Sequence, residues 1–304
     1  MGSTLRTLPP PQAGTASIGC SARNILGLFK LRIGVVIMIT AIAGYAVTPG
    51  SALSAVQFTV LALSVLISSA SAGAFNQYVE FESDRLMART RHRAFPSGAL
   101  RHTPAWLVPI ILLLVGSVAA AWYALNPLAA LFVFLGAFFY AVVYTVWLKR
   151  RSWLNIVIGG MAGSFAVLAG ATAASPSPGM LPLLLALVLF LWTPPHFWSL
   201  AIANRDDYTA ANIPMLPVVV GDARAAQIVF VSTLLLVGAS LLPAYFGAGL
   251  IYLLGALVGG GYFIYKAWQL ARKPSRKTAM GSFFASLLQL SLLLATAMID
   301  ALIR

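Results

Sequence analysis

Apolar and polar residues alternate along the chain in long blocks. Nine apolar stretches are separated by short polar connections, and each is close to the length of about 20 residues that a helix needs to cross a bilayer. The pattern predicts an all-α polytopic membrane protein with nine transmembrane helices and no soluble domain. The predicted spans are residues 31–48, 55–75, 106–124, 127–147, 153–173, 180–200, 225–244, 248–268 and 280–303.

The charged residues gather in every second connection. Only 9% of the 304 residues are charged, against about 25% in a typical soluble domain, and 60% are hydrophobic. Lysine and arginine occupy the N-terminal arm and the even-numbered connections, whereas the odd-numbered connections carry no charge. Because cytoplasmic loops are enriched in these two residues, we expect a cytoplasmic N-terminus. The net charge of +13 then reflects topology and contact with the lipid bilayer, and no nucleic acid is expected as a partner.

The start of the chain has a different composition. Residues 1–22 are rich in Pro, Gly, Ser and Thr and contain no apolar stretch of signal-peptide length. We interpret them as a flexible cytoplasmic tail, and residues 23–304 as a single transmembrane domain. The segment from Ser21 is expected to be a simple flank of the first span. The alternative is an interfacial helix with Lys30 and Arg32 at the lipid head groups.

Five of the seven acidic residues form two clusters, and the first cluster follows the second span. If the helix of that span continues past the membrane boundary, each residue is rotated by about 100° from the one before it. One face of the helix then carries Asn76, Glu80 and Asp84. Glu82 points away from that face. Two carboxylates and an amide oxygen that face the same way are hard ligands, which suit Mg²⁺. The spacing therefore predicts a divalent-cation site at the cytoplasmic end of this helix.

Basic residues near this cluster add a second chemical feature. Arg89 and Arg93 carry planar guanidinium groups that suit a diphosphate, and Lys149 and Arg150 after the fourth span supply further positive charge. The pattern predicts a metal and diphosphate site. A solvated loop of salt bridges is the competing interpretation of the first acidic cluster alone.

The second acidic cluster lies on the same predicted side of the membrane, directly after the sixth span. Its position favours the metal site over the solvated loop. Asp206 and Asp207 are adjacent and cannot share a helical face, so at most one is expected to point inward. Asp300, near the end of the last span, is expected at the surface, paired with Arg304.

The segment NQYVEFESDRLMARTRHR, which begins at Asn76, resembles the N-x-x-x-D-x-x-x-D-x-x-M-x-R-T-x-x-R signature of the UbiA-type intramembrane prenyltransferases. The segments WTPPHFWSLAI, DYTAANIPMLPVV and YTVWLKR resemble the branch of that family whose prenyl acceptor is haem b. The resemblance extends from about residue 24 to the end of the chain. It implies nine transmembrane helices around a central cavity, Mg²⁺ as cofactor, farnesyl diphosphate as donor and haem b as acceptor.

The resemblance also implies roles for individual residues. Asn76, Glu80, Asp84 and Asp207 are the expected catalytic residues, and the three carboxylates among them are the expected Mg²⁺ ligands. Glu80 stands where the family usually has Asp, and the second D-x-x-x-D motif of the family reads NRDDY here, so that its two outer aspartates are missing. The expected substrate-binding residues are Arg89, Arg93, Tyr144, Lys149, Arg150, His196 and Tyr208.

His196 lies in the sixth span after two prolines, which free backbone carbonyl groups. An ionisable residue within a membrane span is a functional candidate by default. Two roles remain open for its imidazole. It could bind the haem iron, or it could stabilise the cavity by bonding to the freed carbonyls.

The activity implied by the resemblance is transfer of a farnesyl group to a haem vinyl group, with addition of water, at the cytoplasmic face of the inner membrane. A downstream haem-modifying enzyme or assembly factors of a terminal oxidase would be further partners. One alternative is another aromatic prenyltransferase of this family, of the quinone or chlorophyll type. A second is a non-enzymatic transporter, whose ion site would lie near the membrane midplane rather than at helix ends.

Overall fold

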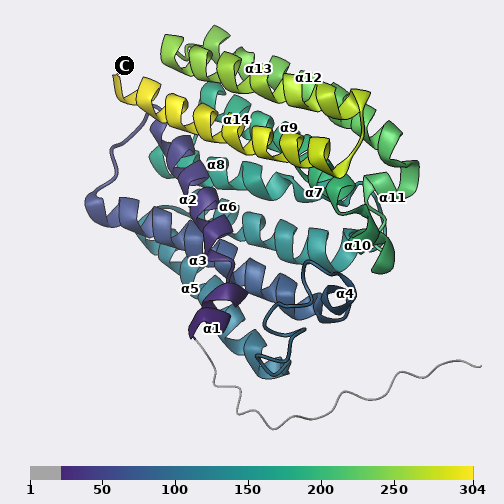
Figure 1. Ribbon diagram of the computed structural model, residues 1–304. Coiled ribbons are helices and arrows are strands. Elements are labelled where there is room, and N and C mark those ends of the chain that lie inside the picture. The colour runs from purple at the N-terminus through teal and green to yellow at the C-terminus, as the bar shows by residue number, and fades with distance from the viewer. Residues whose placement is uncertain (1–21, 304) are drawn as a thin grey trace, which may run out of the picture.

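The computed structural model describes residues 22–303, and every regular element among them is a helix (Figure 1). The expected flexible tail lies outside the described residues, except that Ala22 already belongs to the first helix. The helices are α1 (Ala22–Leu28), α2 (Leu31–Ala46), α3 (Ala55–Val79), α4 (Phe81–Leu86), η1 (Pro104–Trp106), α5 (Leu107–Ala124), α6 (Pro127–Phe138), η2 (Phe139–Leu148), α7 (Asn155–Gly159), α8 (Met161–Ala174), α9 (Met180–Ala203), α10 (Arg205–Ala210), α11 (Leu216–Val220), α12 (Asp222–Tyr245), α13 (Leu250–Arg272) and α14 (Arg276–Ile303).

The predicted spans are confirmed. Within residues 22–303, eight helical segments are long and apolar enough to cross a membrane, and the bent pair of α1 and α2 makes a ninth if it counts as one span. Three of the spans combine two consecutive elements, η1 with α5, α6 with η2, and α7 with α8. The protein is therefore an all-α integral membrane protein.

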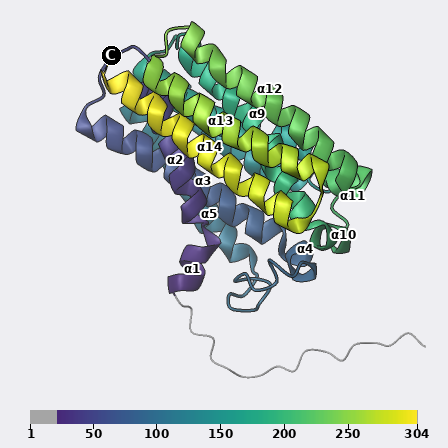
Figure 2. The ribbon, with the colours of Figure 1, turned by 45° about the horizontal axis from the view of Figure 1, so that its top comes forward.

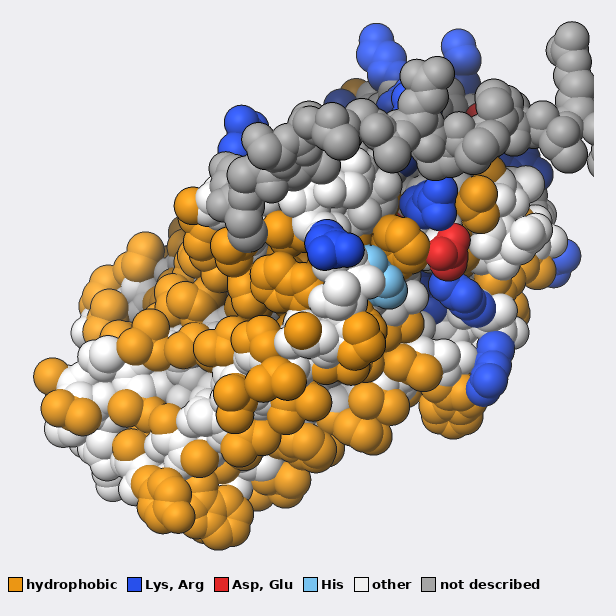
Figure 3. All heavy atoms as spheres, turned by 90° about the horizontal axis from the view of Figure 1, so that it is seen from below, with side chains coloured by type: hydrophobic (Ala, Val, Ile, Leu, Met, Phe, Trp, Pro, Cys, Tyr) orange, Lys and Arg blue, Asp and Glu red, His pale blue; other side chains and the backbone are white. Residues whose placement is uncertain are grey.

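The spans form one bundle in which neighbours in sequence are mostly neighbours in space (Figures 1 and 2). Helices α2, α3, α5, α6 and α8 pack together on one side, and α9, α12, α13 and α14 pack together on the other. Contacts of α8 with α9 and of α2 with α14 join the two sides. Apolar side chains cover much of the outer surface that Figure 3 shows, as the surface of a lipid-facing bundle requires.

Glycine allows α2 and α8 to pack closely. A Cβ atom at Gly170 of α8 would overlap the carbonyl oxygen of Ala41 in α2, and one at Gly44 would overlap the carbonyl oxygen of Val167. Both obstructions are backbone atoms, which cannot move aside as a flexible side chain could. Small residues at such crossings are the usual means of close helix packing in membranes.

The start of the first span differs from the simple flank that the sequence leads us to expect. Helix α1 is a separate short helix, bent by 46° from α2. The side-chain amide of Gln77 in α3 donates hydrogen bonds of 2.9 Å to the carbonyl oxygens of Gly27 and Leu28. These bonds satisfy carbonyl groups that have no hydrogen-bond partner within α1. They also attach the junction between α1 and α2 to α3.

The surface position expected for Asp300 is wrong. Asp300 is only 4% exposed, and its carboxylate accepts a 2.7 Å hydrogen bond from the backbone N–H of Gly249 at the start of α13. This bond satisfies an N–H group that has no partner within the helix. The expected partner, Arg304, lies outside the described residues.

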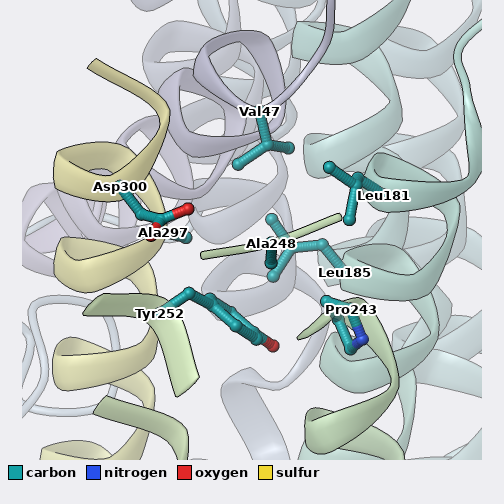
Figure 4. Close-up of a pocket in the computed structure, with 8 residues that line it drawn as sticks. All are labelled: Val47, Leu181, Leu185, Pro243, Ala248, Tyr252, Ala297 and Asp300. Carbon is teal, nitrogen blue, oxygen red and sulfur yellow. The ribbon is translucent and has the colours of Figure 1, made fainter. Parts of the chain in front are cut away.

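Asp300 borders a pocket near the ends of α2 and α14. The pocket is also lined by Val47, Leu181, Leu185, Pro243, Ala248, Tyr252 and Ala297 (Figure 4).

The packing of α2 on α8 generates a stability prediction. Gly170→Ala should destabilise the protein by about 1 to 3 kcal/mol, because the added methyl group meets backbone that cannot give way. Thermal unfolding of the detergent-purified protein measures the change. Gly163→Ala is the matched control, since Gly163 lies on the same helix and a methyl group there would face open space. Equal stability of the two variants would contradict the packing argument.

Candidate active site

Polar residues of several helices meet at one end of the bundle. This end contains the start of α2 and the ends of α3, η2 and α9, together with the short helices α4 and α10. Helices α4 and α10 lie at the same end in both ribbon views (Figures 1 and 2). In Figure 3, basic side chains gather at one end of the molecule around an acidic and a histidine side chain. The charged connections of the sequence therefore converge in space.

The predicted common face of Asn76, Glu80 and Asp84 is confirmed. These residues are 2%, 3% and 0% exposed, whereas the side chain of Glu82 is 72% exposed. Glu80 stands between α3 and α4, yet the backbone N–H of Asp84 still donates to the Glu80 carbonyl oxygen at 2.8 Å. The i to i+4 relation thus continues across the junction and keeps the two carboxylates on the buried side.

Each buried carboxylate has a cationic partner. Glu80 forms an ion pair with Lys149, and Asp84 Oδ2 lies 2.7 Å from Arg93 Nη1. The second oxygen of the same carboxylate, Asp84 Oδ1, is buried and has no hydrogen-bond partner. Burial alone would raise the pKa of the Glu80 carboxyl, but Lys149, Lys30 and Arg93 outweigh burial and hold its pKa below the usual value of 4.5. Glu80 is therefore ionised at neutral pH.

Asn76 is held from two sides. Its Oδ1 accepts a 2.6 Å hydrogen bond from Lys30 Nζ, and its Nδ2 donates to Thr145 Oγ1 at 3.0 Å. Thr145 belongs to η2, a π-helical stretch, and its hydroxyl donates to the Tyr140 carbonyl oxygen. The rings of Tyr140 and Tyr144 stack with their centres 5.7 Å apart. Stretches of π-helix occur frequently at functional sites.

The second acidic cluster contacts the loop that follows α4. Asp207 accepts hydrogen bonds from the backbone N–H groups of Ala88 at 2.9 Å and Arg89 at 3.3 Å. The Arg89 side chain donates to the Tyr208 hydroxyl at 3.1 Å and lies 5.0 Å from the centre of its ring. Asp206 is exposed, so the prediction that at most one of the two aspartates points inward is confirmed.

The three carboxylates expected to bind metal do not form one cluster. In the described part of the chain, no group of three or more His, Cys, Asp or Glu residues is placed to hold a metal ion. Glu80 and Asp84 remain together, whereas Asp207 is occupied by backbone N–H groups. Arg150 is exposed and reaches the site at its edge, where its guanidinium lies 3.4 Å from Ser83 Oγ.

His196 lies apart from the charged cluster, at the contact of α9 with α14. It is 6% exposed, and its ring stacks on Trp192 at 4.1 Å and on Phe283 at 4.6 Å between ring centres. Nδ1 lies 2.6 Å from Ser286 Oγ, whose own hydrogen is donated to the Phe283 carbonyl oxygen. When the serine hydroxyl donates to Phe283, it accepts from Nδ1–H, and this tautomer has a lone pair on Nε2.

Lys30 is the residue of this site that the sequence did not reveal. The sequence suggests it only as a head-group contact, because it lies near the first predicted span with Arg32. The local sequence contains no signal for its inward position, which depends on the break between α1 and α2.

The chain is similar in sequence to one family of known proteins. The model of the UbiA prenyltransferase family matches residues 37–292. The chain is 55% identical over 279 residues to protoheme IX farnesyltransferase 2 of Paramagnetospirillum magneticum, covering 92% of this chain and 97% of the relative. It is 41% identical over 292 residues to the protoheme IX farnesyltransferase of Methylococcus capsulatus, covering 95% and 97%.

Two solved structures share the fold. A structure described for digeranylgeranylglyceryl phosphate synthase in membranes superposes with a TM-score of 0.76 at 19% identity, covering 93% of this chain and 99% of that one. A UbiA homologue of Archaeoglobus fulgidus bound to GPP and Mg²⁺ superposes with a TM-score of 0.67 at 15% identity, covering 90% and 99%.

The buried pair of Glu80 and Lys149 generates a prediction about stability. Glu80→Gln or Lys149→Met alone should cost about 3 to 5 kcal/mol, because each leaves an unpaired buried charge. The double variant should cost clearly less than the sum of the two, as measured by thermal unfolding in detergent. Additive losses would show that the two side chains do not interact.

The same pair predicts a pH dependence. The pKa of Glu80 is lower in the folded protein than in the unfolded chain, so the contribution of its charge is complete above about pH 4.5. It is lost as the pH falls through the folded value. The stability gap between the wild type and Glu80→Gln should therefore be constant near neutral pH and narrow only in acid.

Proposed function

Because the chain belongs to the UbiA prenyltransferase family, we propose that it transfers the farnesyl group of farnesyl diphosphate to a vinyl group of haem b, with addition of water, giving haem O and diphosphate. Relatives named for this activity match it over nearly their whole length. The observation that carries the proposal is the buried cluster of two carboxylates, Glu80 and Asp84, each paired with a cation at the end of membrane helices.

Mg²⁺ is the proposed cofactor, with Glu80 and Asp84 as its ligands. The buried Asp84 Oδ1 supports this assignment, because it is a hard oxygen without a hydrogen-bond partner. Two carboxylates suffice, since Mg²⁺ is usually bound by one or two together with substrate phosphates. When bound, the ion would stabilise the negative charge that develops on the leaving diphosphate. Asp207 could join as a third ligand while its oxygens still accept from the N–H groups of Ala88 and Arg89, because each oxygen keeps a second lone pair.

The remaining catalytic work is assigned to side chains of the cluster. Arg89, Arg93, Lys149 and Arg150 bind and orient the diphosphate, and Asn76 lies on the same face as the two carboxylates. Departure of diphosphate with the bonding electron pair leaves an allylic cation on the farnesyl group.

Aromatic rings at the site can stabilise the allylic cation. The stacked ring of Tyr144 lies 5.6 Å from Lys149 Nζ, close to where the diphosphate would bind, and its face can stabilise positive charge. A haem vinyl group attacks the cation and forms the new carbon–carbon bond. Water then adds to the resulting haem cation and releases a proton.

His196 is proposed as the contact with the acceptor. Its Nδ1 is engaged with Ser286 rather than with a backbone carbonyl, and in the tautomer with the proton on Nδ1 the lone pair on Nε2 can bind the haem iron. Tyr208, bonded to Arg89, is proposed to position that arginine for the donor.

The proposed location is the inner membrane, with the active site at the cytoplasmic face. The alternation of charged and uncharged connections supports this orientation. A downstream haem-modifying enzyme or assembly factors of a terminal oxidase are the proposed recipients of the product.

The first test is product formation. Detergent-purified protein should convert haem b and farnesyl diphosphate in the presence of Mg²⁺ to a haem that carries a hydroxyethylfarnesyl group, as identified by mass spectrometry. EDTA should abolish the reaction. Failure of the intact protein to modify haem, combined with turnover of a quinone or chlorophyll precursor, would favour the alternative prenyltransferase instead.

The second test compares two carboxylates of helix α4. Asp84→Asn should lower turnover roughly 100-fold or more, because it removes a proposed metal ligand while it keeps the side-chain size. Glu82→Gln should change turnover less than about twofold, since Glu82 is exposed and forms an ion pair with the exposed Arg85. Similar losses in both variants would overturn the assignment of the buried face.

A further inference from the structure

Ser286 of α14 contacts two aromatic side chains of α9. Its backbone carbonyl oxygen accepts a 2.9 Å hydrogen bond from the indole Nε1–H of Trp192. Its hydroxyl oxygen lies 2.6 Å from Nδ1 of His196, four residues further along α9. Because Ser286 is fully buried, water does not compete for either bond. One residue of the last span therefore orients two side chains of another span.

The stacked rings around His196 fix the plane of its imidazole. The interplanar angles are 20° with Trp192 on one contact and 26° with Phe283 on the other. A half-turn of the imidazole about its Cβ–Cγ bond would preserve both stacks, yet it would exchange Nδ1 with Cδ2 and Nε2 with Cε1. The hydrogen bond with Ser286 distinguishes these two orientations, since a ring carbon cannot replace Nδ1 in it. Stacking and hydrogen bonding together define where Nε2 points.

The backbone of α14 also bears on the proton of this imidazole. The Ser286 hydroxyl donates to the carbonyl oxygen of Phe283 at 2.6 Å, and a hydroxyl that donates there accepts from Nδ1–H. In this tautomer Nε2 carries a lone pair and is the nitrogen left for a ligand. The hydrogen bond at one ring nitrogen thus selects the chemistry available at the other.

We propose that Ser286 is the positioning residue for His196 as a ligand of the acceptor haem iron, a role that rests on the proposed function. Ser286 selects the ring orientation and the tautomer in which Nε2 presents its lone pair to the iron. Partners of this kind orient metal-binding histidines in many proteins. Because the iron lies at the centre of the porphyrin, the direction of Nε2 also sets how closely a haem vinyl group approaches the farnesyl cation.

A purely structural link between α9 and α14 is the rival explanation. The same two helices share a second buried contact, in which the hydroxyl oxygens of Ser199 and Ser282 lie 2.9 Å apart. Ser282 precedes Ser286 by four residues on α14 and does not bond to His196. If both serines only join the helices, their replacement should lower thermal stability and leave haem binding unchanged. A positioning residue changes the bond between imidazole and iron.

The test titrates haem b into the full-length, detergent-purified protein and records absorption and, after reduction, the resonance Raman band of the iron–histidine bond. The wild type should show this band, and His196→Ala should lack it. Ser286→Ala should weaken haem binding roughly 10- to 100-fold and shift or broaden the band, because the imidazole loses its fixed orientation. Ser282→Ala is the matched control and should bind haem like the wild type.

Kinetics provide the second readout. Ser286→Ala should raise the KM for haem b and leave the KM for farnesyl diphosphate within about twofold. Wild-type haem affinity and an unchanged band in Ser286→Ala, or equal losses in Ser282→Ala, would overturn the proposal. A wild-type band in His196→Ala would overturn it as well. A wild type that binds haem through His196 but does not farnesylate it would instead contradict the proposed reaction and leave the role of Ser286 supported.

Discussion

The site depends on the pairing of buried carboxylates with buried cations at the end of membrane helices. Glu80 and Asp84 are buried, and their pairing with Lys149 and Arg93 offsets the free-energy cost of placing isolated charges there. The pairs also connect separate elements, since Glu80 follows α3 and Lys149 follows η2. The same interactions that keep the charges available for chemistry therefore hold the helix ends in register.

Much of this fold could be predicted from the sequence, because a bilayer imposes simple rules on length and charge. The nine apolar stretches coincide with the observed spans. The shared face of Asn76, Glu80 and Asp84 followed from helical geometry alone, since the hydrogen bonding of α3 continues through its junction with α4. Local periodicity is sufficient where one helix carries all the residues concerned.

The rest depends on contacts between distant segments, which no local pattern encodes. Lys30 turns inward because of a left-handed turn that Gln77 holds from another helix. Asp300 is buried because it caps the start of α13. Asp207 bonds to backbone groups of a loop far earlier in the chain, as the separation of 119 residues from Ala88 shows. In each case the sequence shows a charged residue, but its partner is decided by the tertiary fold.

The π-helical stretch η2 has a consequence for the permitted length of this segment. In a π-helix, each hydrogen bond spans one residue more than in an α-helix, and the N–H of Lys149 accordingly bonds the carbonyl oxygen of Tyr144, five residues earlier. Deletion of one residue between Phe139 and Leu148 would remove the extra residue of a π-helical turn and let the stretch relax towards an ordinary α-helix, with the residues after it in nearly the same rotational phase. Lys149 would then keep its direction towards Glu80. This span therefore tolerates the loss of one residue here, whereas the same deletion in an ordinary α-helix would rotate everything after it by about 100°.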